Sequence, residues 1–356
     1  MLSGSPLTAD FEAAVLEAPL ARRAGGDFSR YGRAALLAVG GQAELYRAVD
    51  LPLGRDVALK VLRRELADEP GADQRLVREA RLTAALDHPA IAPVYDMGRD
   101  PAGRPYFAMA LRPGPTLHAV LGGLRRGSAA VERRWQLVDL VGALARLAEA
   151  LDYAHRRQVV HGDLKPENVL LGADGAVTLL DWGLAVVAEP RARRRVEAAV
   201  FPRERVVLGS PQYMAPEAVQ GGPLGPAADV YGLGVLLYEC LTLQTPHRGA
   251  TAAATLRQIV AESPMPPGVA APQRGVPPRV DAVCLAALAK SPGDRWSSVA
   301  ALRDALQECA LELWGGDESG EPKSSPTRVS SDLRNLVPLN FDAGHCQADP
   351  FHALNG

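Results

Sequence analysis

The chain has 356 residues, of which 47% are hydrophobic, so it can bury a large core and is not disordered as a whole. Its formal net charge of −2 excludes the strongly basic balance of a general nucleic-acid binder. Because no apolar run reaches the roughly 20 residues of a membrane helix, and the first residues do not form a secretory signal, we expect a cytoplasmic protein without a membrane anchor.

Residues 30–111 form a first unit, preceded by an extension, residues 1–29, whose function the sequence does not indicate. Short apolar runs separated by glycines predict strands at 36–39, 44–49 and 56–62. Residues 73–86 repeat apolar side chains with helical spacing, and His88-Pro89 ends that helix. The first unit is therefore expected to be rich in strands, with one helix.

Residues 112–314 form a second unit, which is mainly helical. Apolar residues recur every three or four positions in the predicted helices at 135–157, 227–243, 280–290 and 297–313. Two short strands, 169–171 and 177–180, flank the hairpin signal Asp174-Gly175. From residue 315 to 356 the apolar period is lost and Gly, Ser, Pro and acidic residues dominate, so we expect a disordered tail.

Lys60 closes the apolar strand Val57-Ala58-Leu59-Lys60, where a charge is costly to bury without a partner. Glu79, on the predicted helix that follows, is a candidate partner. A lysine held in this way could present its ammonium group to phosphate oxygens. Taken alone, the two residues are better explained as a solvated strand end and an ordinary glutamate on a helix surface.

A more specific pattern is the segment His-Gly-Asp-Leu-Lys-Pro-Glu-Asn at 161–168. Phosphoryl transfer needs a carboxylate that takes the proton of the attacking hydroxyl, a cation beside the moving phosphoryl group and an oxygen that helps to hold a metal ion. Asp163, Lys165 and Asn168 could supply these groups. Asp181, in Leu180-Asp181-Trp182-Gly183, ends the next strand and could reach the same metal ion.

In their order and spacing, these motifs resemble those of the eukaryotic-type (Hanks-type) serine/threonine protein kinases, in a form similar to the bacterial members. The resemblance runs from about residue 31 to 313. It includes Gly-Ser-Pro-Gln-Tyr-Met-Ala-Pro-Glu at 209–217, Asp-Val-Tyr-Gly-Leu-Gly at 229–234 and Asp-Arg-Trp at 294–296. It implies an α+β fold of two lobes, a small β-rich N-lobe (30–111) and a larger helical C-lobe (112–314), and a buried ion pair between Glu217 and Arg295.

The same resemblance implies ATP and Mg²⁺ as cofactors, protein substrates as partners, and a role for each matching residue. Asp163 would be the catalytic base, Lys165 would contact the γ-phosphate, and Asn168 and Asp181 would bind Mg²⁺. Lys60 would contact the α- and β-phosphates, with Glu79 holding it in place. The other residues expected to bind ATP are Gly40, Gly41, Leu37, Leu45, Ala58, Met109, Ala110, Arg112 and Leu170.

The adenine end of this expected site follows from the same match. Met109 would guard the back of the adenine pocket, and the backbone of Ala110 and Arg112 would give hydrogen bonds to the base. Ala58, Leu45 and Leu170 would then enclose the ring from two sides. Without the family resemblance, each of these residues would be interpreted as an ordinary part of the core.

Two of the departures from the family pattern bear on activity. Ala38 and Ala43 stand where the phosphate loop usually has its first and third glycines, which predicts a less adaptable loop and a lower ATP affinity or slower turnover.

Gly162 replaces the arginine that usually binds a phosphate of the activation loop, and residues 184–208 contain no Ser, Thr or Tyr. We therefore expect activity without phosphorylation of that loop. Its six arginines form either a solvated basic segment or a docking site for acidic substrates.

The sequence thus predicts transfer of the γ-phosphoryl group of ATP to Ser or Thr hydroxyls of proteins. A pseudokinase scaffold is an alternative, because of the two alanines and Gly162, and it would bind nucleotide without transfer. A small-molecule kinase of the aminoglycoside phosphotransferase type shares the His-Gly-Asp and Asp-Trp elements, but not the segments at 209–217 and 229–234. A pure interaction protein without nucleotide chemistry is the remaining class.

Overall fold

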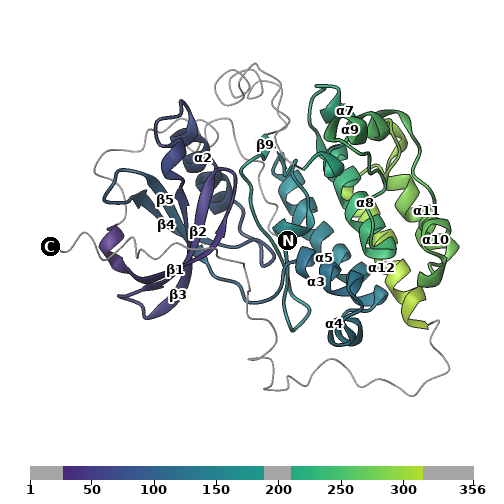
Figure 1. The fold of residues 1–356 in the computed structure, drawn as a ribbon, viewed down its shortest axis with the longest axis horizontal. Coiled ribbons are helices and arrows are strands. Elements are labelled where there is room, and N and C mark those ends of the chain that lie inside the picture. Colours follow the sequence, from purple (N-terminus) through teal and green to yellow (C-terminus); the bar gives the residue numbers. More distant parts are fainter. Residues whose placement is uncertain (1–26, 188–209, 316–356) are drawn as a thin grey trace.

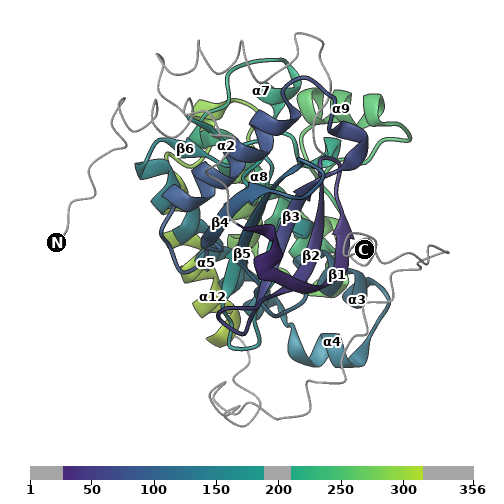
Figure 2. The same ribbon diagram turned by 90° about the vertical axis from the view of Figure 1, so that its left-hand side faces the viewer.

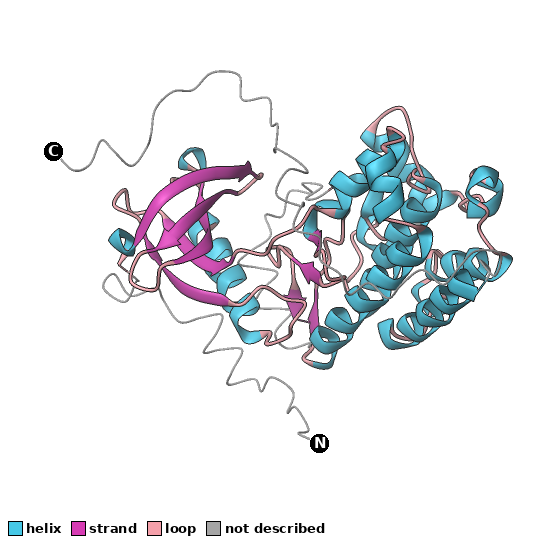
Figure 3. Ribbon diagram, turned by 90° about the horizontal axis from the view of Figure 1, so that it is seen from below, coloured by secondary structure: helices cyan, strands magenta, loops and turns pink. Residues whose placement is uncertain are grey.

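The computed structural model describes residues 27–187 and 210–315, which form two lobes (Figure 1). Figure 3 separates them by their secondary structure, with a twisted sheet in the small lobe and helices in the large one. The predicted two-lobed α+β fold is confirmed. Most of the expected extension (1–29), nearly all of the expected tail (315–356) and most of segment 184–208 lie outside the described residues.

The small lobe is built on a five-stranded antiparallel sheet with the order β1-β2-β3-β5-β4. Its strands are β1 (Tyr31–Val39), β2 (Ala43–Asp50), β3 (Arg55–Leu62), β4 (Val94–Arg99) and β5 (Pro105–Ala110). Strand β1 begins five residues before the predicted run at 36–39. Its pairing with β2 shifts register twice, between Gly32 and Ala35 and between Leu36 and Ala38. These irregularities break the alternation by which a half-buried strand is recognised in a sequence.

Helix α2 (Ala72–Ala85) confirms the helix predicted at 73–86 and covers one face of this sheet (Figure 2). Its side chains Leu76 and Ala80 are buried together with Leu62 of β3 and Phe107 of β5. Four apolar side chains that leave water together stabilise such a layer by several kcal/mol, at about 1.5–3 kcal/mol for each large one. This packing fixes the rotation of the helix and therefore the direction of its other side chains.

The large lobe contains the remaining helices. They are α3 (Leu117–Arg125), α4 (Ala129–Arg134), α5 (Leu137–Arg156), α7 (Pro216–Val219), α8 (Pro226–Thr242), α9 (Ala252–Ala261), α10 (Pro267–Ala270), α11 (Pro278–Ala287) and α12 (Val299–Gly315). The four long predicted helices correspond to α5, α8, α11 and α12, with ends that differ by at most three residues. The largest difference is at the end of α11, because Leu288 caps the helix by donating its N–H to the carbonyls of Cys284 and Leu285.

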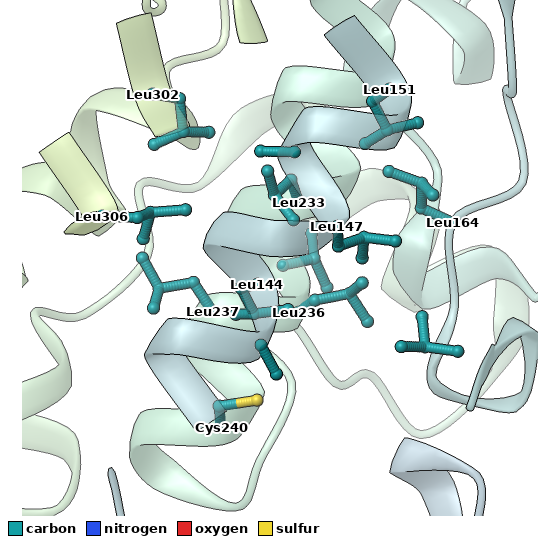
Figure 4. Close-up of a cluster of buried hydrophobic side chains, with 14 of the residues drawn as sticks. Leu144, Leu147, Leu151, Leu164, Leu233, Leu236, Leu237, Cys240, Leu302 and Leu306 are labelled. Atoms are coloured by element: carbon teal, nitrogen blue, oxygen red, sulfur yellow. The ribbon is translucent and has the colours of Figure 1, made fainter. Parts of the chain in front are cut away.

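Helices α5, α8 and α12 pack their leucines into one core, which also holds a residue of the segment 161–168 (Figure 4). Leu164 is only 3% exposed and belongs to the same buried cluster as Leu147 of α5 and Leu233 of α8. Helix α8 comes close because Gly232 has no side chain; a Cβ there would lie 3.1 Å from the Leu164 side chain. The leucine between Asp163 and Lys165 therefore anchors both polar residues to the most buried part of the lobe.

Two short antiparallel strand pairs hold the polar segments on either side of this core. They are β6 (Val159–Val160) with β9 (Val186–Val187), and β7 (Val169–Leu171) with β8 (Val177–Leu179). The predicted turn is present between β7 and β8, where Gly175 has a φ of +82°, a conformation that glycine adopts freely. Within residues 27–187 and 210–315, none of the helices combines the length and the apolar character needed to cross a bilayer.

Candidate active site

Lys60 lies in the middle of the small-lobe sheet, where its strand pairs with both neighbours, opposite Leu45 of β2 and Phe107 of β5. Its Nζ donates to Oε1 of Glu79 at 2.5 Å, and the Glu79 side chain is only 3% exposed. Burial raises the pKa of Glu79 to about 7, although the lysine opposes this shift. The predicted pair between strand and helix is therefore formed, and each charge is held where water cannot replace its partner.

Asp181 connects this pair to the large lobe. Lys60 Nζ also donates to Oδ1 of Asp181 at 3.0 Å, so that one ammonium group lies between two carboxylates from different parts of the chain. Burial alone would raise the pKa of Asp181, but the adjacent lysine lowers it to about 2, so the carboxylate is ionised at neutral pH. Asp181 has a φ of +60°, a strained conformation for a residue other than glycine, and such residues are typical of functional sites.

Asp229 of α8 holds the start of segment 161–168 in place. Its buried carboxylate accepts hydrogen bonds from the backbone N–H groups of His161 and Gly162, both at 2.8 Å, and contacts Nε2 of His155 at 2.7 Å. Burial would raise the pKa of Asp229, but its hydrogen bond with His155 helps to lower it below the ordinary value. One charged side chain thus fixes the backbone directly before Asp163, in the manner of a clamp with three donors.

Asp163, Lys165 and Asn168 lie together as predicted. Lys165 Nζ donates to Oδ2 of Asp163 at 2.5 Å, and Nδ2 of Asn168 donates to the backbone carbonyl of Asp163 at 3.0 Å. Burial raises the pKa of Asp163, and Lys165 opposes the shift. A carboxylate with a raised pKa, in reach of a cation, can act as a general base near neutral pH.

The residues expected to hold Mg²⁺ suit that ion in their chemistry. Leu180, next to Asp181, donates its N–H to the Asn168 carbonyl at 2.8 Å, which brings the two expected ligands to one place. Because the amide nitrogen of Asn168 is used by Asp163, the amide oxygen stays available. In the described part of the chain, no cluster of three or more His, Cys, Asp or Glu side chains could hold a metal by itself. Mg²⁺ commonly binds one or two carboxylates and completes its shell with phosphate oxygens and water.

The residues expected around the adenine base occupy the sheet and its junction with the large lobe. Ala58 of β3 is paired with Met109 of β5, and Ala110, which ends β5, is also buried. Arg112 follows at the junction and is exposed. Across the junction, Leu170 of β7 forms a bridge to Thr116, the residue that caps α3.

The remaining expected residues surround the loop between β1 and β2. Gly40 and Gly41 are exposed at the loop, whereas Leu37 of β1 and Leu45 of β2 are partly buried. Leu45 lies opposite Lys60 in the strand register. The structure therefore places these four residues on β1, on β2, which pairs with the strand of Lys60, and on the loop between β1 and β2.

The expected ion pair between Glu217 and Arg295 is also formed. Arg295 donates to both carboxylate oxygens of Glu217, at 2.8 and 2.7 Å, and its side chain is 0% exposed. Its other donors reach the carbonyls of Ala227, Ala289 and Lys290. The arginine thus joins the start of α7 to the start of α8 and to the loop after α11.

Two residues of this arrangement, Asp229 and His155, were not assigned a role from the sequence. A signal for Asp229 existed, because an acidic residue at the head of an otherwise apolar helix must have a partner if it is buried. What the sequence could not indicate is which groups it binds. Asp229 binds mainly backbone N–H groups, and because nearly all residues have one, their type does not show which of them Asp229 binds.

The sequence matches the protein kinase domain family over residues 31–307. It is 38% identical to the probable serine/threonine-protein kinase SCO3848 of Streptomyces coelicolor over 291 residues, which cover 81% of this chain and 40% of that protein. It is 35% identical to the serine/threonine-protein kinase PknB of Mycobacterium tuberculosis over 319 residues, or 89% and 47% of the two chains. With the serine/threonine-protein kinase PknD of Chlamydia trachomatis it shares 34% identity, over 78% of this chain and 31% of the relative.

This chain therefore spans less than half the length of each of these relatives. The match nevertheless includes every element described above, from β1 through most of α12, and covers more than half of this chain. The paired Lys60 and Glu79, the segment 161–168 and Asp181 all lie within it. On this basis, the chain belongs to the protein kinase domain family.

Proposed function

We propose that this protein is a serine/threonine protein kinase, which transfers the γ-phosphoryl group of ATP to Ser and Thr hydroxyls of protein substrates. The observation that carries the proposal is the position of Lys60. Its ammonium group contacts Glu79 and Asp181, and Asp163 with Lys165 lies in the neighbouring segment of the large lobe. The two lobes are thereby joined at the side chains that phosphoryl transfer requires.

In this proposal the acceptor hydroxyl lies at Asp163, which orients it and takes its proton. The hydroxyl oxygen forms a bond to the γ-phosphorus, while the bond from that phosphorus to the oxygen bridging the β- and γ-phosphates breaks, and ADP leaves. Lys165, held at 2.5 Å from Asp163, stabilises negative charge on the moving phosphoryl group. Lys60 holds the α- and β-phosphates, and Glu79 keeps the lysine side chain in the required direction.

Asn168 and Asp181 would hold Mg²⁺ through the free amide oxygen and the ionised carboxylate. Bound there, the ion would neutralise charge on the phosphate oxygens. The adenine base would contact Ala58, Leu45 and Leu170, with Met109 behind it and the backbone of Ala110 and Arg112 beside it. Leu37, Gly40 and Gly41 would cover the nucleotide from the side of β1.

We also propose that activity does not depend on phosphorylation of segment 184–208. Gly162, which stands in place of the usual phosphate-binding arginine, has a φ of +74°, a backbone conformation in which other residues are strained. Position 162 has no arginine to bind a phosphate, and segment 184–208 has no Ser, Thr or Tyr hydroxyl to carry one. The six arginines of the segment suggest that the substrates are acidic proteins.

One experiment tests these points together. The purified protein is treated with a phosphatase, the phosphatase is removed, and γ-labelled ATP, Mg²⁺ and either an acidic or a basic generic protein are added. We expect label on serine and threonine, more on the acidic protein, and a rate equal to that of the untreated enzyme. Nucleotide binding without any transfer would indicate a pseudokinase, and labelling of a sugar or aminoglycoside but of no protein would indicate a small-molecule kinase.

A further inference from the structure

The phosphate loop between β1 and β2 is held by contacts beyond the pairing of these two strands. Ala43, which stands at the place of the usual third glycine, is only 5% exposed. Its methyl group belongs to the apolar cluster formed by Leu62, Ala72, Leu76, Ala80 and Phe107, between the sheet and α2. The alanine thus removes backbone freedom and adds a buried contact at the point where the loop enters β2.

The loop itself closes as a tight turn. The N–H of Gly40 donates to the carbonyl of Ala43 at 2.8 Å. Among residues 27–187 and 210–315, the N–H groups of Gly41 and Gln42 have no hydrogen-bond acceptor. These two N–H groups at the tip of the turn can therefore donate to phosphate oxygens.

Arg63, the first residue after β3, binds both ends of this turn. Its Nη1 donates to the carbonyl of Gly40 at 3.2 Å, and its backbone N–H donates to the carbonyl of Gln42 at 3.2 Å. Its Nε is also bound, to Oε2 of Glu65 at 3.2 Å. Lys60 lies on β3, three positions before Arg63, so Arg63 connects the turn to the strand that carries the lysine.

Gln42 extends this connection to the helix. Its Nε2 donates to the carbonyl of Ala72 at 3.3 Å, and Ala72 is the first residue of α2. The same helix carries Glu79, the partner of Lys60. Strands β2 and β3 pair with each other, and Ala43 of β2 shares an apolar cluster with Ala72 of α2.

We propose that Arg63 is a positioning residue, which holds the turn at Gly40 and Gly41 in the conformation that binds the phosphates of the nucleotide. In a loop with glycine at three positions, the chain can close around the phosphates after they arrive. Here two of these glycines are alanines, and the side chain of Arg63 sets the conformation beforehand. This inference rests on the proposed binding of ATP, but it does not need phosphoryl transfer.

The test measures the binding of ATP and of adenosine separately. In the variant Arg63→Ala, the guanidinium bond to Gly40 is lost, and we expect the Kd for ATP to rise about 3- to 10-fold, as for one hydrogen bond of ordinary strength. The Kd for adenosine, which has no phosphates, should stay within about twofold of the wild type, as expected where no contact changes. In Arg63→Lys the ammonium group can still reach the Gly40 carbonyl, so ATP binding should largely return.

Arg64→Ala is the matched control, because Arg64 is exposed, adjacent and of the same charge, and it should bind ATP like the wild type. If the protein transfers phosphate, Arg63→Ala should raise KM for ATP by the same factor while kcat stays nearly constant. Equal losses for ATP and adenosine, equal effects of Arg63→Ala and Arg64→Ala, or unchanged ATP binding in Arg63→Ala would each overturn the inference. If the wild type itself binds no ATP, the proposed function has failed, a result distinct from these.

Discussion

The substitution Asp163→Asn is expected to lower kcat for phosphoryl transfer about 10²- to 10⁴-fold, the usual contribution of a general base. Asparagine has the same shape as aspartate and can still accept the hydrogen bond from Lys165, but it cannot take a proton from the acceptor hydroxyl. Because Asp163 is assigned to the acceptor hydroxyl and not to the nucleotide itself, KM for ATP should change by less than about threefold. The measurement is initial rate against ATP concentration at saturating protein substrate.

The matched control is Asp87→Asn, since Asp87 is exposed, follows the end of α2 and has no role in the proposed site. It should leave kcat and KM unchanged. Full activity of Asp163→Asn would contradict the role of Asp163, and so would an equal fall in both variants. A rise in KM for ATP with constant kcat would place Asp163 in nucleotide binding instead.

The second large effect concerns stability. Arg295→Met is expected to lower the free energy of unfolding by about 3–5 kcal/mol, because it removes one partner of a buried ion pair and leaves the other uncompensated. The loss reaches further than Glu217, since the carbonyls of Ala227, Ala289 and Lys290 also lose a donor. The four tryptophans, Trp135, Trp182, Trp296 and Trp314, lie in the large lobe, so urea unfolding followed by their fluorescence reports on it.

The control is another arginine with a single carboxylate partner. Arg279 pairs with Glu308 on the surface, where the two side chains are 54% and 58% exposed, and Arg279→Met should cost less than about 1 kcal/mol. In the double variant Glu217→Gln with Arg295→Met, the loss should be clearly smaller than the sum of the single losses, because neither charge is left alone. Similar losses for Arg295→Met and Arg279→Met would contradict the structural role of the buried pair.

Much of the site could be predicted because its side chains carry their chemistry in their type and spacing. Lys60 at the end of an apolar run, Glu79 on the next helix and the spacing of Asp163, Lys165 and Asn168 each suggested a role. The structure shows Lys60 in contact with Glu79, and both Lys165 and Asn168 in contact with Asp163. The long helices could be predicted for a similar reason. Their buried faces, such as that of α5, repeat with the period of a helix and leave a clear pattern.

What the sequence did not indicate is mostly made by the backbone. Asp229 accepts hydrogen bonds from the backbone N–H groups of His161 and Gly162, and Arg63 donates to a backbone carbonyl of the loop. Because nearly all residues have these backbone groups, the sequence does not show which of them are bound. Such contacts become visible only when the fold brings the segments together. The first half of β1 was missed for a related reason, since its register shifts replace the regular alternation of inward and outward side chains.

The central claim is that Lys60, Asn168 and Asp181 act on one nucleotide and its metal ion, and the most direct test is ATP binding with and without Mg²⁺. The wild type should bind ATP more tightly when Mg²⁺ is added, and Asp181→Asn should lose that gain. Lys60→Met should bind ATP weakly in both conditions, because it lacks the ammonium group for the phosphates. Tight ATP binding by Lys60→Met, or a gain from Mg²⁺ in Asp181→Asn equal to that of the wild type, would contradict the proposed arrangement.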